Sequence, residues 1–205
     1  KKMKYLLQGL TMGLAYVAPI GLQNLFVINT ALTQKRSRAF ITAFIVIFFD
    51  VTLALACFFG IGSIMEKSKL LERGILLVGS FIVIYIGIGL VKAKGSLNNS
   101  TEVNIPLIKV VTTACVVTWF NPQAIIDGSM MLGAFRASLP PGEGMKFISG
   151  VAFASCMWFI GMTIFITCFS SKITEKVLRI INIVCGAVII FYGIKLFYSF
   201  IQMVI

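Results

Sequence analysis

Two carboxylates lie inside long apolar stretches of this chain. Asp50 stands in the middle of the run FIVIFFDVTLALACFF, and Asp127 lies five residues after Pro122 in WFNPQAIID. An aspartate at the centre of a bilayer costs about 2.5–3.5 kcal/mol on insertion scales. No lysine or arginine stands inside these two runs. We therefore expect a proton, a cation or a cationic substrate to neutralise each carboxylate. A protonated aspartate that bonds a helix carbonyl for structural reasons is the alternative.

Each half of the chain also carries a proline inside an overlong apolar run. Proline removes a backbone donor and frees a carbonyl about one turn earlier, so a helix that unwinds there exposes carbonyl groups and N–H groups at mid-membrane. Matching interruptions in two repeats indicate the binding site of a transporter, whereas a simple kink at each proline is the alternative. The predicted substrate-binding residues are Pro19, Gly21, Gln23, Asn24, Asn121, Pro122, Gln123 and Asp127, and the predicted proton-coupling residues are Asp50 and Asp127.

Composition places these residues in a membrane protein. The 205-residue chain is 59% hydrophobic and only 12% charged, with a mean hydropathy of +0.99, whereas a soluble domain carries about 25% charged residues. We therefore predict an all-α polytopic membrane protein in which no extramembrane segment is long enough for separate chemistry. The apolar runs cover residues 5–33, 39–63, 74–91, 107–135, 147–169 and 177–201.

The six runs fall into two halves that look related. A polar linker, residues 94–106, separates a first unit, residues 1–93, from a second, residues 107–205. The two prolines are 103 residues apart, and Gly79 matches Gly186 at 107 residues, as do the tyrosines six residues further on. Chance matches of these common residues are the alternative.

Two units of three spans imply opposite orientations in the membrane, because three is an odd number. The predicted fold is six transmembrane helices arranged as two inverted three-helix repeats, with helices 1 and 4 broken at Pro19 and Pro122.

The net charge of +11 does not indicate nucleic-acid binding, because the 18 Lys and Arg residues lie mainly in the joints between apolar runs. There they anchor helix ends and meet anionic lipid headgroups. Counts of eight near one side and nine near the other leave the membrane orientation undecided. Histidine is absent and the five cysteines are scattered, so the sequence predicts no metal site and no cofactor.

Four motifs in order along the chain carry a resemblance to a known family. PIGLQN at residues 19–24 is similar to a first-helix signature Pro-x-Gly-Pro-Gln-Asn, and TWFNPQAIID at residues 118–127 to Thr-Trp-Leu-Asn-Pro-His-x-x-x-Asp. Asp50 fits a second-helix aspartate, and RIINIVCG at residues 179–186 fits Arg-Ile-Ile-Asn-x-x-x-Gly. These signatures are those of the LysE family of bacterial amino acid exporters, in its lysine/arginine branch.

Two departures from the family pattern affect the predicted site. Leu22 replaces a proline, which leaves the first break to Pro19 and Gly21. Gln123 replaces a histidine, which leaves proton handling to the two aspartates.

The resemblance implies a secondary active transporter, not an enzyme, in the bacterial cytoplasmic (inner) membrane. Its cargo would be L-lysine or L-arginine, exported in exchange for protons. The half-helix ends would hold the α-carboxylate and α-ammonium, and Asp127 with Asp50 would face the side-chain cation. The implied partners are the amino acid, protons and membrane lipid, and a homodimer is left open.

Three other functions stay open on the sequence. An exporter of neutral amino acids, of the threonine, homoserine or leucine type, is similar at Asn-Pro but typically lacks an aspartate at the position of Asp127. A thiol-disulfide electron carrier needs paired cysteines at the breaks, and only Cys115 lies near Pro122. A passive channel would show no dependence on a proton gradient.

Overall fold

The computed structural model describes residues 2–19, 21–60, 69–92, 106–169 and 175–204. Every regular element in these ranges is a helix. The first half contains α1 (Lys2–Val17), α2 (Leu22–Thr33), α3 (Arg36–Phe59) and α5 (Lys69–Lys92). The second half contains α6 (Leu107–Trp119), α7 (Pro122–Gly128), the π-helix η1 (Ser129–Gly133), α8 (Ala134–Ser138), α9 (Gly144–Phe169) and α10 (Glu175–Val204).

The all-helical, apolar character predicted from composition is confirmed. Among the described residues, α3 and α9 are each long and apolar enough to cross a membrane alone. At 1.5 Å per residue the 24 residues of α3 extend about 36 Å, which exceeds the roughly 30 Å hydrocarbon core of a bilayer. The predicted linker, residues 94–106, lies almost entirely outside the described ranges, so the division into two units stays a prediction.

The first apolar run forms two helices. α1 ends at Val17 and α2 begins at Leu22, and the pair is apolar enough to span a membrane together but bends by 77° at the join. Gly21 precedes α2 in an extended conformation, with φ −123° and ψ −170°.

The fourth run is also divided. α6 ends at Trp119, Asn121 is extended at φ −104° and ψ 95°, and Pro122 starts α7. A proline disfavours helical geometry in the residue before it and fits the first turn of a new helix. The chain then passes through the π-helical turn η1 before α8.

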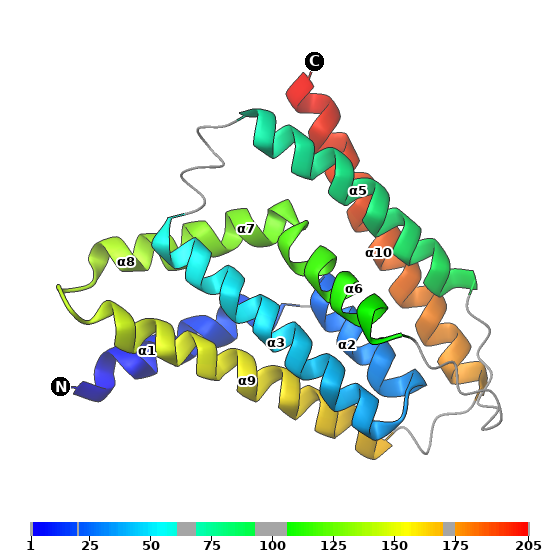
Figure 1. Ribbon diagram of the computed structural model, residues 1–205, viewed down its shortest axis with the longest axis horizontal. Helices are drawn as coiled ribbons and strands as arrows, with labels where there is room; N and C mark the ends of the chain where they lie inside the picture. Colours follow the sequence, from blue (N-terminus) through cyan, green and yellow to red (C-terminus); the bar gives the residue numbers. More distant parts are fainter. Residues whose placement is uncertain (1, 20, 61–68, 93–105, 170–174, 205) are drawn as a thin grey trace.

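α3 lies at the centre of the molecule, with α9 running beside it in the opposite direction (Figure 1). It contacts α2, α6, α7, η1 and α8 as well. α1 packs closely on α9 because both helices carry glycines at the crossing. A Cβ at Gly9 would overlap the backbone of Phe147, and one at Gly150 would overlap that of Leu6. Small residues allow such close approach of helices in membranes.

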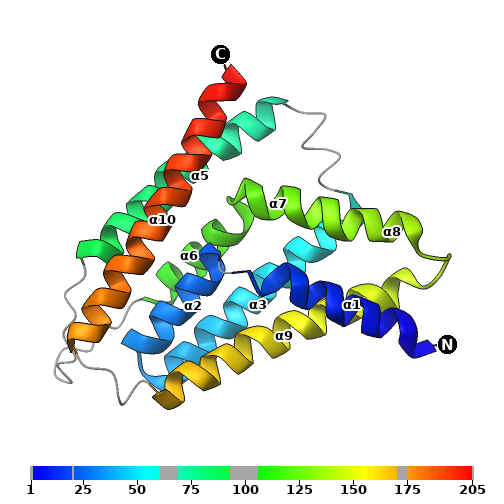
Figure 2. The same ribbon diagram turned by 180° about the vertical axis from the view of Figure 1, so that it is seen from behind.

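α5 and α10 form an antiparallel pair along one edge of the molecule, visible from both sides (Figures 1 and 2). This pair meets the rest of the protein through Val83 and Ile189, which pack with the first residues of α2 and the last residues of α6. The edge pair therefore touches the protein next to both divided runs.

Candidate functional site

Asp50 lies at the centre of a polar network deep in the helical body. Its side chain is 0% exposed, and its two carboxylate oxygens accept hydrogen bonds from Gln23 Nε2 at 3.2 Å and Ser155 Oγ at 2.6 Å. Gln23 Nε2 also donates to Thr118 Oγ1 at 3.0 Å. The network joins α2, α3, α6 and α9 at one point. No lysine or arginine of the described chain forms an ion pair with Asp50.

The join between α1 and α2 is closed by Asn24. This side chain is 3% exposed, and its Nδ2 donates to the carbonyl oxygens of Val17 at 3.0 Å and Pro19 at 2.7 Å. Its Oδ1 accepts a bond from Trp158 Nε1 at 3.0 Å. The carbonyl groups of Val17, the last residue of α1, and of Pro19 are therefore bonded within the protein, and Trp158 connects the join to α9.

The join between α6 and α7 has a different construction. Asn121 occupies the N-cap position of α7 but its side chain makes no capping hydrogen bond. α3 holds the chain on both sides of the join: Trp119 Nε1 donates to Thr52 Oγ1 at 3.3 Å, and Cys57 Sγ donates to the carbonyl oxygen of Ile125 at 3.6 Å. The side chains of Pro122 and Gln123 are not among those described.

Asp127 lies on the exposed side of α7, in contrast to the enclosed Asp50. The next residue, Gly128, is buried, and a Cβ there would lie 2.9 Å from Cys57 Sγ and 3.2 Å from the Tyr16 ring. Tyr16 lies within electrostatic reach of both Asp50 and Asp127. The ring of Tyr16, near the end of α1, thus lies against the residue that follows Asp127.

Some of the predicted site residues bond one another, and others contribute only a backbone position. Gln23 and Asp50 bond directly, and Asn24 bonds Pro19. Gly21 provides the extended residue before α2, and Asn121 provides the one before α7. The roles of these residues in binding substrate or protons stay predictions.

Several polar side chains in the network, at the α1–α2 join or next to α7 were not identified as site residues from the sequence. Ser155 lies 105 residues after Asp50, close to the offset of the proposed repeat, so a search for any polar counterpart would have found it. Thr118 stands inside the TWFNPQAIID motif, which offered a second signal. Tyr16 and Trp158 carry no such signal, because aromatic residues are common in spans.

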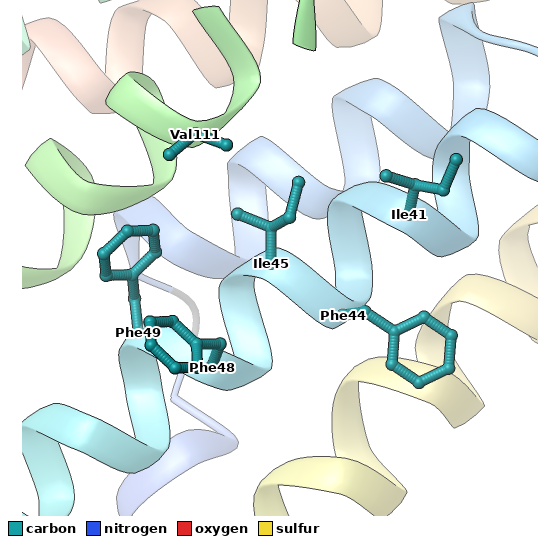
Figure 3. A pocket seen from close by; sticks show the side chains of 6 residues that line it. All are labelled: Ile41, Phe44, Ile45, Phe48, Phe49 and Val111. Carbon is teal, nitrogen blue, oxygen red and sulfur yellow. The ribbon is translucent and has the colours of Figure 1, made fainter. Parts of the chain in front are cut away.

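An apolar hollow of about 370 Å³ lies between α3 and α6, and no residue of this network lines it (Figure 3). A hydrophobic lining of this kind offers no partner for an amino acid's charged groups, so the polar network is the better candidate site. The hollow is lined by Ile41, Phe44, Ile45, Phe48, Phe49 and Val111.

Comparisons with known proteins give the family to which the chain is similar. The family described as LysE type translocator matches residues 14–200. The arginine exporter protein ArgO of Klebsiella pneumoniae (strain 342) is 32% identical over 197 residues, which cover 94% of this chain and 92% of that protein. ArgO of Escherichia coli (strain K12) is 30% identical over the same length, and ArgO of Salmonella schwarzengrund is 31% identical over 189 residues. No solved structure matches significantly.

Proposed function

We propose, from the premise that the chain belongs to the LysE type translocator family, that it exports the basic amino acids L-arginine and L-lysine in exchange for protons. The chain is a multi-pass protein of the bacterial inner membrane, as its family and its apolar helices indicate. Relatives named arginine exporter align with nearly its whole length. These names favour a cationic cargo over a neutral one.

The observation that carries the proposal is the position of Asp50. A carboxylate enclosed among α2, α3, α6 and α9, with hydrogen-bond donors but no basic partner in the described chain, is expensive to maintain for packing alone. Ionisable residues inside membrane proteins mark proton and substrate pathways. In the proposed exchange, Asp50 takes up a proton when the cationic substrate leaves.

Coupling to protons has an energetic reason. Moving one positive charge outward against an inside-negative potential costs about 2.3 kcal/mol per 100 mV. Inward movement of a proton returns that charge, so a one-for-one exchange removes the electrical cost. A carboxylate that binds either a proton or a cation links the two fluxes.

We also propose that the six predicted spans form two inverted repeats with their breaks at Pro19 and Pro122. The arrangement supports this: α3 and α9 run side by side in opposite directions, as do α5 and α10 (Figures 1 and 2). Packing crosses between the halves, with α1 against α9 and with α7, η1 and α8 against α3. Under this repeat Asp50 and Ser155 are counterparts that bond each other. The two proposed repeats would then meet at this pair, with an acidic side chain, Asp50, contributed by the first repeat only.

Asp127 is the proposed selector of a cationic side chain. Asp127→Asn removes the charge while keeping the size, so arginine and lysine efflux should be abolished in proteoliposomes while the thermal stability of the purified protein is retained. The matched control is Glu143→Gln, a loop carboxylate that pairs with Lys146 at 2.8 Å, and it should export normally. Undiminished arginine efflux by Asp127→Asn would overturn this role.

The same proteoliposomes separate the alternatives. Labelled arginine and lysine are followed with and without an imposed pH gradient, in competition with threonine and leucine. Export that ignores the gradient indicates a channel, and preferred export of threonine or leucine indicates a neutral amino acid exporter. Loss of export in a cysteine-free variant would favour the thiol-disulfide carrier instead.

A further inference from the structure

Gly79 on α5 lies directly against the turn that separates α6 from α7. A Cβ at this position would overlap the carbonyl oxygen of Phe120, the residue that follows α6. The neighbouring atom is backbone, so it cannot rotate away as the end of a flexible side chain could. Any larger residue at this position requires either α5 or the Phe120–Asn121 peptide to move.

The turn at Phe120 is held on its other side by α3. Trp119, immediately before the turn, bonds Thr52, and Ile125, just after it, accepts a bond from Cys57. The turn therefore lies between α3 and α5. The contact with α5 is made by Gly79, which has no side chain. Asn121 and Pro122, the next two residues, belong to the proposed substrate site.

The other glycines of α5 show that this contact is not general. Gly87 faces α10, where a Cβ would lie 2.7 Å from Ile190 Cγ1 and 3.0 Å from the Gly186 carbonyl oxygen. Gly74 and Gly89 have nothing within 4 Å of such an added atom. The helix thus carries one glycine against the turn, one against its partner helix and two in open positions.

We propose that Gly79 is a positioning residue for substrate binding, which sets the location of the α6–α7 turn and through it that of Asn121 and Asp127. This inference rests on the proposed export of basic amino acids. A displacement of about 1 Å in a binding constellation can cost a hundredfold in function. Gly79→Ala should therefore weaken the apparent affinity for arginine by at least about tenfold.

The experiment compares three alanine variants on the same helix. Gly79→Ala, Gly87→Ala and Gly89→Ala are purified in detergent and assayed for arginine binding by calorimetry, for arginine export in proteoliposomes and for thermal stability. Gly87→Ala should lower the melting temperature but leave affinity within about twofold, because its contact is remote from the turn. Gly89→Ala should change neither. Gly79→Ala should raise the arginine concentration for half-maximal export and weaken binding beyond any effect on stability.

Two results would overturn the inference: wild-type affinity in Gly79→Ala, or equal losses of affinity in Gly79→Ala and Gly87→Ala. Should Gly79→Ala fail to accumulate, Val83→Ala tests the position of α5 through a different contact, because Val83 packs against the start of α2 and the end of α6. Val110→Ala, at the far end of α6 and also buried, is its control. Weakened binding in Val83→Ala alone supports positioning, and equal binding in both contradicts it. Failure of the wild-type protein to bind or export arginine would instead refute the proposed function.

Discussion

The joins α1–α2 and α6–α7 differ in how their backbone and polar groups are satisfied. At the first join the buried Asn24 amide bonds two freed carbonyls, and Gln23 bonds the enclosed Asp50. At the second, Asn121 makes no capping bond, and the nearby Asp127 is exposed. We call the first join closed, because a side chain bonds its carbonyl groups, and the second open, because its N-cap side chain makes no capping bond. Under the proposed function, the first join would hold the proton-coupling residue Asp50 and the second would meet the substrate.

Asp50→Asn is the most severe test of this division. The amide keeps the shape of the side chain but cannot exchange a proton, so arginine export driven by a pH gradient should fall about a hundredfold or more, the scale of losing a proton-transfer group. Export in proteoliposomes measures the effect, and tryptophan fluorescence during heating checks folding. If export by Asp50→Asn still depended on the pH gradient, Asp50 would not be the proton-coupling residue.

Asn24→Ala tests the closure of the first join. The variant leaves two backbone carbonyls and the Trp158 indole without partners, and its unfolding free energy should fall by about 1–3 kcal/mol. The matched variant Asn121→Ala loses no capping bond and should change stability by less than about 0.5 kcal/mol. Unfolding in a denaturing detergent measures both. Equal losses in the two variants would remove the distinction between the joins.

Thr118→Val asks whether α6 takes part in the closed network. The substitution keeps the side-chain shape but removes one of the two acceptors of Gln23 Nε2. Stability should fall by about 0.5–1.5 kcal/mol, with a smaller loss of export than in Asp50→Asn. An unchanged stability would show that Gln23 needs only the carboxylate as its partner.

Among the variants that remove a hydrogen bond, Trp119→Phe should have the smallest effect. It removes a bond of 3.3 Å to Thr52, and such bonds between membrane helices contribute about 0.6 kcal/mol on average. The phenylalanine ring keeps most of the packing against the cluster of Leu53, Cys57 and Ile125. Denaturation should therefore detect only a slight loss, with export nearly intact. A loss comparable to that of Asn24→Ala would mean that the second join depends on this anchor as strongly as the first depends on its amide.

Much of the architecture was predictable from hydropathy and proline chemistry. Two apolar runs coincide with single helices over their described residues, the run 39–63 with α3 and the run 147–169 with α9. α1 and α6 end at Val17 and Trp119, close to Pro19 and Pro122, and proline lacks an N–H group and restricts the residue before it. That these prolines break two membrane spans stays a prediction. Asp50 and Gln23 could be selected because polar groups are costly in apolar runs.

Tertiary packing alone decided which polar groups meet. Asp50 and Ser155 are 105 residues apart and Asn24 and Trp158 are 134 residues apart, and a hydrogen bond at that separation depends on how the helices cross. The same packing encloses Asp50 and leaves Asp127 exposed, although both stand in apolar sequence. Local sequence determines whether a residue is helical and costly to bury. Neighbouring helices determine whether it is buried and with which partner.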